Sequence, residues 1–333
     1  MIAQQSTTIP PLVSGGVMLT YRCTNACKHC LYRCSPRHEP HFAPPEQVDA
    51  TFAALAREPR LSGVHLAGGE ATLDWDRLVY AIQSARKHHV TLDYLETNAS
   101  WCRDETTARA GFERLQQAGL NGVLISASLF HNEFTPLAYT KAAVRAAWDV
   151  FGRGGVLIWT PDVLSRMDRG LDEDRRHTLK QSCELLGIDL DSGELWQVHG
   201  YLTPGGRCAE RLQSGIRRLP AEAFEGSSCK GTLASTHHFH IDPFGNLYSG
   251  HCPGISVASI ENLHPGISEA SHPLFWRLWE GGPFAVWSDL ASDFRPDASG
   301  YISKCHFCLE LRKHLRATAS GRFGELRPDE FYR

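Results

Sequence analysis

Apolar residues recur in two alternating patterns along the first 200 residues. Apolar runs of five or six residues, typical of buried strands, alternate with longer stretches whose apolar residues fall every three or four positions, typical of amphipathic helices. The predicted strands are Val17–Tyr21, Gly63–Ala67, Thr91–Glu96, Gly122–Ser126, Val156–Thr160 and Leu195–His199. The predicted helices are one beginning at Pro45, then Trp75–His88, Thr106–Ala118, Ala138–Phe151 and Asp172–Leu186.

This alternation predicts a parallel sheet, because each helix returns the chain to the edge where the previous strand began. The pattern alone does not distinguish an open sheet from a curved one. In both arrangements ligands bind at the carboxyl ends of the strands. We therefore look for the functional site in the segments that follow the predicted strands.

The pattern changes near Arg207. Glycine and proline become frequent, the helices shorten, and Phe239–Leu247 is predicted to form a hairpin around Asp242–Asn246. We therefore predict a first domain at residues 1–206 and a small α+β domain at residues 207–333.

Charge and hydropathy exclude several classes of partner. The chain has 34 basic and 37 acidic residues, a formal charge of -3, and no long run of one sign. We therefore expect no nucleic-acid and no membrane partner. No stretch is apolar for 18 residues, and the amino terminus lacks the features of a secretion signal, so we expect a cytoplasmic protein.

The chain has eleven cysteines, which in a cytoplasmic protein indicate metal binding more than disulfides. Cys23, Cys27 and Cys30 follow the first predicted strand with the spacing Cys-x3-Cys-x2-Cys. Three thiolates can bind three irons of a 4Fe-4S cluster and leave the fourth iron open to another ligand. A zinc loop and unrelated core cysteines are the alternatives.

This loop resembles the signature of the radical S-adenosylmethionine (SAM) superfamily, with His29 at the position where an aromatic residue is usual. The resemblance implies a 4Fe-4S cluster whose open iron chelates the amino and carboxylate groups of SAM. It also implies reductive cleavage of SAM to a 5'-deoxyadenosyl radical. The fold that it implies is a partial (β/α)6 TIM-like barrel of parallel strands.

Gly68, Gly69 and Glu70 directly follow the second predicted strand. Glycines allow a ligand to approach the backbone closely, and a carboxylate can accept a charge-assisted hydrogen bond from an ammonium group. The segment is similar to the family's Gly-Gly-Glu motif, which contacts the amine of SAM. A simple turn after a strand is the alternative.

Short polar side chains end the third and fourth predicted strands. They are Thr97, Asn98, Ser126 and Ser128. The family carries similar segments here, so the resemblance implies contacts to the ribose or methionine part of SAM. A helix cap or turn explains Asn98 equally well.

Three residues are candidates for substrate contact. His131 follows the fourth strand, where related enzymes often have a His-Asp pair, although a surface role explains it equally well, and His199 ends the sixth predicted strand. Arg207 lies in a Pro-Gly-Gly-Arg segment similar to the Gly-Arg turn of family members with carboxy-terminal clusters. Its guanidinium would supply a fixed positive charge.

A second group of cysteines lies in the carboxy-terminal part. Cys305 and Cys308 form a close pair, and Cys229 and Cys252 flank the predicted hairpin that would bring them together. The arrangement resembles the Twitch domain, a shortened relative of the SPASM extension, which binds one auxiliary 4Fe-4S cluster. A zinc site made by the same four thiolates is the alternative.

Four cysteines remain, and we expect buried thiols with Cys208 as the candidate for an extra ligand. They are Cys34, Cys102, Cys183 and Cys208. His238 and His240 fall on one face of a strand, where a polar sheet face is expected and metal binding is the alternative.

The resemblance implies a radical SAM oxidoreductase with two 4Fe-4S clusters. We expect it to remove hydrogen from a substrate C–H bond and to use the auxiliary cluster for electron transfer, in dehydrogenation or bond formation on a small polar substrate. The electron donor would be a flavodoxin or ferredoxin. The alternatives are a peptide maturase, which forms crosslinks or thioethers with a separate leader-binding partner, and a non-catalytic iron-sulfur or zinc protein.

Overall fold

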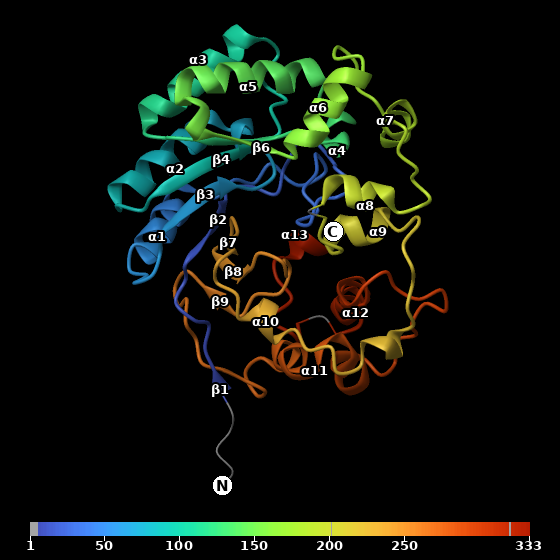
Figure 1. The fold of residues 1–333 in the computed structure, drawn as a ribbon. Coiled ribbons are helices and arrows are strands. Elements are labelled where there is room, and N and C mark those ends of the chain that lie inside the picture. The colour runs from blue at the N-terminus through green and yellow to red at the C-terminus, as the bar shows by residue number, and fades with distance from the viewer. Residues whose placement is uncertain (1–5, 201, 320) are drawn as a thin grey trace.

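The computed structural model describes residues 6–200, 202–319 and 321–333 and is built around an eight-stranded sheet (Figure 1). The strands lie in the order β6-β5-β4-β3-β2-β7-β8-β9. Their bounds are β2 Ser14–Met18, β3 Gly63–Ala67, β4 Leu92–Thr97, β5 Val123–Ser126, β6 Val156–Trp159, β7 Phe239–Ile241, β8 Asn246–Ser249 and β9 Ala258–Ser259. A separate antiparallel pair joins β1 (Ser6–Thr7) to β10 (Ile267–Ser268).

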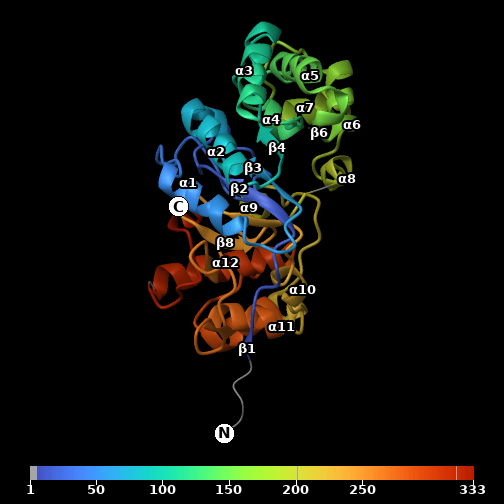
Figure 2. The ribbon, with the colours of Figure 1, turned by 90° about the vertical axis from the view of Figure 1, so that its left-hand side faces the viewer.

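Four amphipathic helices pack on the outer face of the parallel strands and bury their apolar sides there (Figures 1 and 2). They are α1 Pro45–Leu55, α2 Trp75–Lys87, α3 Glu105–Ala118 and α5 Leu137–Phe151. Asp74 and Asp104 begin α2 and α3 by accepting hydrogen bonds from the backbone N–H groups of Arg77 and Thr107.

Shorter helices and the carboxy-terminal helices complete the structure. They are α4 Leu129–Asn132, α6 Pro161–Gly170, α7 Leu179–Leu186, α8 Glu194–His199, α9 Gly206–Arg211, α10 Lys230–Leu233, α11 Pro273–Leu290, α12 Lys304–Thr318 and α13 Asp329–Tyr332. Three short 3-10 turns lie at Ala71–Leu73, Arg153–Gly155 and Ala221–Phe224. No helix in the described part of the chain has both the length and the apolar character needed to span a membrane.

The sheet is mostly parallel, which confirms the predicted α/β fold and is consistent with a partial TIM-like barrel. The strands from β2 to β6 pair in parallel, and five of the six predicted strands are present, although the first runs over Ser14–Met18 where Val17–Tyr21 was predicted. The sixth is wrong, because Leu195–His199 lies in the helix α8. Its two buried residues, Leu195 and His199, are four positions apart and so lie on one helical face.

The helix predicted over Asp172–Leu186 is shorter in the structure. It begins only at Leu179, where Thr178 and Gln181 form a capping box that fixes the amino terminus of α7. The preceding segment is rich in charged residues and has no apolar face. A separate helix, α6, was not predicted, and Pro161 is its first residue.

The carboxy-terminal segment extends the same sheet. β7 pairs in parallel with β2, and the predicted hairpin is confirmed because β7 and β8 pair antiparallel with Ile241 opposite Leu247. A second hydrophobic core lies in the carboxy-terminal segment and includes residues of α11 and α12. The division at residue 206 stays a prediction, since the two segments share one sheet.

Gly15 allows β7 to pack against β2. A Cβ atom built on Gly15 would lie 2.3 Å from the backbone oxygen of Phe239, its partner across the ladder, and 2.6 Å from the Phe239 ring. A backbone atom cannot move away as the end of a flexible side chain can. The junction between the two segments therefore requires a residue without a side chain at this position.

We expect Gly15→Ala to lower the free energy of unfolding by about 1–3 kcal/mol, because the added methyl group forces β2 and β7 apart. Urea denaturation measures this change. The matched control is Gly154→Ala, since a Cβ atom there meets nothing within 4 Å. Equal midpoints for Gly15→Ala and the unaltered protein would show that this contact does not constrain the junction.

Candidate active site

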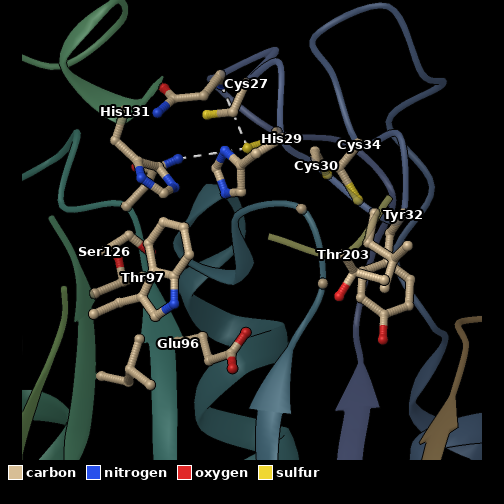
Figure 3. Close-up of a pocket in the computed structure, with 18 of the residues that line it drawn as sticks. Cys27, His29, Cys30, Tyr32, Cys34, Glu96, Thr97, Ser126, His131 and Thr203 are labelled. Carbon is tan, nitrogen blue, oxygen red and sulfur yellow. Dashed lines mark hydrogen bonds between the residues drawn. The ribbon is translucent and has the colours of Figure 1, made fainter. Parts of the chain in front are cut away.

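A cavity of about 290 Å³ lies where the parallel strands end (Figure 3). The cysteine loop after β2 and the segments that end β3, β4 and β5 together form its wall. The predicted site residues in this wall are Cys23, Cys27, Cys30, Gly68, Gly69, Thr97, Asn98, Ser126 and His131. The structure therefore brings most of the predicted SAM and cluster residues to one place.

Cys23 and Cys27 are buried, and Cys30 is partly buried. Burial raises the pKa of Cys23 to about 12 and also raises that of Cys27, so neither ionises at neutral pH without a nearby cation. Cys23 Sγ accepts hydrogen bonds from Asn25 N at 3.4 Å and from Asn98 Nδ2 at 3.5 Å. These N–H donors would stabilise a thiolate bound to metal.

The donor set fits a 4Fe-4S cluster with one open iron. Three thiols share one cavity wall, and each thiolate of a cubane binds a different iron. Among the described residues, no three His, Cys, Asp or Glu side chains are placed to hold a single metal ion. Cys23, Cys27 and Cys30 are therefore the residues that would hold the cluster.

Arg207 forms hydrogen bonds with the backbone of the cysteine loop outside the cavity. Its guanidinium donates to the carbonyl oxygens of Cys27 (2.9 Å), Arg33 (2.6 Å) and Cys34 (2.9 Å), and its backbone N–H donates to the oxygen of Cys30 at 3.0 Å. It is not among the residues that line the cavity. The structure thus places Arg207 as a positioning residue for the loop.

Glu70 lies next to the cavity but is not in its wall. Its buried carboxylate accepts hydrogen bonds from Thr72 Oγ1 (2.7 Å), Thr97 Oγ1 (2.9 Å) and Asn98 N (2.8 Å). It therefore ties the end of β3 to the end of β4. Gly69 permits close packing of the cysteine loop, because a Cβ atom there would lie 1.9 Å from the oxygen of Arg22.

Of the predicted residues His131, Ser128 and His199, only His131 lines the cavity. His131 lines the cavity, and its Nδ1 is 2.8 Å from Ser128 Oγ, so Ser128 orients the ring. Burial lowers the pKa of His131 to about 3, which keeps it neutral. His199 is buried behind the wall, with its ring 4.5 Å from that of Phe130.

Several wall residues were not predicted as site residues. They are Asn25, His29, Leu31, Tyr32, Cys34, Glu96, Leu124, Trp159, Leu202, Thr203 and His238. His29 stacks on Trp159 with ring centroids 4.8 Å apart, so its planar ring packs as an aromatic residue would. Glu96 could have been found from strand alternation, since it lies two residues after Tyr94 on the inner face of β4.

The second group of cysteines also shares one cavity wall. Cys229, Cys252, Cys305 and Cys308 line it together with the cations Lys304 and Arg312. Burial raises the pKa of Cys308, and the guanidinium of Arg312 acts in the opposite direction. Four thiols beside two positive charges fit a fully ligated cluster, which carries net negative charge.

The cavity that these four cysteines help to line has a volume of about 30 Å³. A single zinc ion occupies less space than a four-iron cluster, so zinc and the cluster require different spacings of the four thiols.

None of the eleven cysteines forms a disulfide. Cys34 lines the first cavity and hydrogen-bonds Cys30, which lowers the pKa of Cys30 to about 6. Cys102 and Cys183 are buried in apolar cores, as expected. Cys208 packs in the same apolar core as Cys27 and lines neither cysteine-walled cavity.

Comparisons with known proteins address the cysteine loop and the sheet. Residues 17–151 match the family model described as the Radical SAM superfamily. No curated protein matches the chain.

Solved structures resemble the chain at low sequence identity. A structure of BtrN with AdoMet (SAM) and 2-DOIA is 14% identical, with a TM-score of 0.42, over 82% of this chain and 89% of that one. A structure of anSMEcpe with AdoMet is 13% identical, with a TM-score of 0.39, over 78% and 79%. Coproporphyrinogen III oxidase (HemN) from Escherichia coli is 14% identical, with a TM-score of 0.32, over 53% and 43%.

The matched region spans β2 to α5 and so contains the cysteine triad, the two glycines and Ser126. These are the residues that the structure gathers around one cavity. The chain therefore carries a radical SAM domain at residues 17–151.

Proposed function

We propose that this protein is a radical SAM oxidoreductase that acts on a C–H bond of a small polar substrate. When bound, the 4Fe-4S cluster and SAM supply a 5'-deoxyadenosyl radical that removes hydrogen from the substrate. The observation that supports this proposal is the shared cavity of the cysteine triad, Gly68, Gly69 and Ser126. A dehydrogenation or a bond formation follows from this chemistry.

Different residues of the cavity wall would bind the cluster and SAM. Cys23, Cys27 and Cys30 would hold three irons, while the side chains of Thr97 and Ser126 offer hydrogen bonds to a bound nucleoside or sulfonium ligand. The rings of His29 and Trp159 stack on each other and form an aromatic part of the same wall.

The oxidising part of the proposal depends on the second cysteine group. Cys229, Cys252, Cys305 and Cys308 would hold an auxiliary 4Fe-4S cluster, which with four thiolates has no open iron and is suited to electron transfer. A flavodoxin or ferredoxin as electron donor and a cytoplasmic location belong to the same proposal.

Metal analysis of protein reconstituted anaerobically tests the two sites. We expect about eight irons per chain, from two 4Fe-4S clusters. About four irons and one zinc would instead mean that the carboxy-terminal site is structural, and would contradict the auxiliary cluster while leaving the radical SAM site intact.

Two cysteine substitutions separate the proposed roles. Cys27→Ala should abolish formation of 5'-deoxyadenosine from SAM, because the cluster loses one of three ligands. Cys308→Ala should retain SAM cleavage and lose the oxidised product. Chromatography of both products measures this, and a variant Cys308→Ala that forms product at the normal rate would refute the division of labour.

Arg207→Met should weaken retention of the first cluster, because three loop carbonyls lose their donor at a cost of about 2 kcal/mol or more. The readouts are iron per chain after gel filtration and the electron paramagnetic resonance spectrum of the reduced cluster. Arg207→Lys should restore part of the retention. The control is Arg211→Met, an exposed arginine on the same helix.

Equal iron retention in Arg207→Met and Arg211→Met would show that the loop does not depend on this guanidinium. A lower melting temperature with unchanged iron retention would assign Arg207 to fold stability alone.

A further inference from the structure

The cavity contains a carboxylate without a partner. Figure 3 shows Glu96 on the far side of the cavity from Cys27. Its side chain is 38% exposed, and this exposed part belongs to the cavity wall. The nearest basic atom is His65 Nε2 at 3.6 Å from Oε1, which is too long for a hydrogen bond.

No lysine or arginine is among the described residues that line this cavity. The basic groups near Glu96 are histidines, and a contact between two of them limits how many protons they can carry. His65 Nε2 and His240 Nε2 are 3.3 Å apart. One of the two nitrogens must carry the hydrogen and the other must accept it, so the pair cannot be doubly protonated.

A missing side chain on β2 makes this histidine contact possible. A Cβ atom built on Gly16 would lie 2.5 Å from the Nε2 atoms of both His65 and His240. Burial lowers the pKa of His65 to about 4, and burial and the neighbouring histidines also lower the pKa of His238 and His240. This face of the barrel is therefore polar and without positive charge.

The pKa of the Glu96 carboxyl group is raised, because no nearby cation offsets the effect of its burial. Burial raises the pKa of Glu96 to about 7, with only a smaller opposing effect from His238. Supplying a cation within hydrogen-bonding distance would restore its ionised form. A protonated amine has both the charge and the N–H donors that an unpartnered carboxylate needs.

The rest of the wall indicates what else the ligand carries. Thr203 places a hydroxyl group at the same cavity, next to Tyr32, whose own hydroxyl donates to the oxygen of Gly250 at 2.9 Å and lies 2.9 Å from His240 Nδ1. Hydroxyl groups donate and accept hydrogen bonds and so suit a ligand with hydroxyl groups of its own.

We propose that Glu96 binds a protonated amine of the substrate, and that the substrate is a small amine that also carries hydroxyl groups. This inference rests on the proposed function in one respect, since it takes the cavity as the place where substrate binds. Glu96 acts here as a binding and specificity residue.

Three probes that share one sugar ring test this inference: D-glucosamine, D-glucose and D-glucuronate. Their binding to the anaerobically reconstituted holoenzyme with SAM present is measured by ligand-observed nuclear magnetic resonance. We expect glucosamine to bind at least about tenfold more tightly than glucose, because only the amine adds a charge-assisted hydrogen bond. Glucuronate should bind least, since its carboxylate meets Glu96.

Glu96→Gln keeps the shape of the side chain and removes its charge, so the preference for glucosamine should disappear. Glu96→Asp keeps the charge and should retain part of the preference. The matched control is Asp93→Asn, which removes one negative charge from the same strand at an exposed position near His65, and it should keep the full preference. The melting temperature confirms that each variant is folded.

Three results would overturn the inference. They are glucosamine binding no better than glucose, a preference that persists in Glu96→Gln, and no glucosamine binding at all. SAM also carries an amine, so its affinity is measured separately. An equal loss of SAM affinity in Glu96→Gln would assign the carboxylate to SAM and overturn the substrate role.

The same protein distinguishes this failure from failure of the proposed function. If the unaltered holoenzyme forms no 5'-deoxyadenosine, the radical reaction fails whatever the probes do. If it forms 5'-deoxyadenosine but shows no amine preference, only the inference about Glu96 fails.

Discussion

The candidate site depends on the close packing of the cysteine loop against the end of β3. Gly69 N donates to the oxygen of Thr20 at 2.7 Å, and Glu70 N donates to that of Arg22 at 2.9 Å. These bonds hold the residues just before Cys23 against the two glycines, and the space for them exists only because Gly69 has no side chain. The glycines thus place the triad over the sheet as well as leaving backbone open to a ligand.

The features that depend only on residues close together in the sequence could be predicted from the sequence. The triad, the hairpin of β7 and β8 and five of the parallel strands follow from spacing and periodicity. The strand predicted at Leu195–His199 failed because a short apolar run has no clear period, and only its packing decides between helix and strand. The neighbour of β2 in the sheet, β7, comes from more than 200 residues further along the chain, which no local pattern can show.

The roles of Glu70, Arg207 and Glu96 could not be predicted for a similar reason. Each depends on which groups the fold brings near its charge. Glu70 accepts hydrogen bonds from three donors and so links the ends of two strands. Arg207 donates hydrogen bonds to the carbonyl groups of the cysteine loop. Glu96 meets no donor among the described residues. A motif identifies the residue types that are required, but the partner of each charge decides its role.

The polar inner face of this sheet opposes stability. Strands of parallel sheets are usually apolar on both faces, whereas this face carries Glu96, His65, His238 and His240. Burying polar groups without full hydrogen bonding costs free energy, and such costs concentrate at functional sites. The outer face, where α1, α2, α3 and α5 pack, is apolar and needs no such groups. Binding of a ligand is therefore the physical reason that best accounts for polar residues inside the barrel.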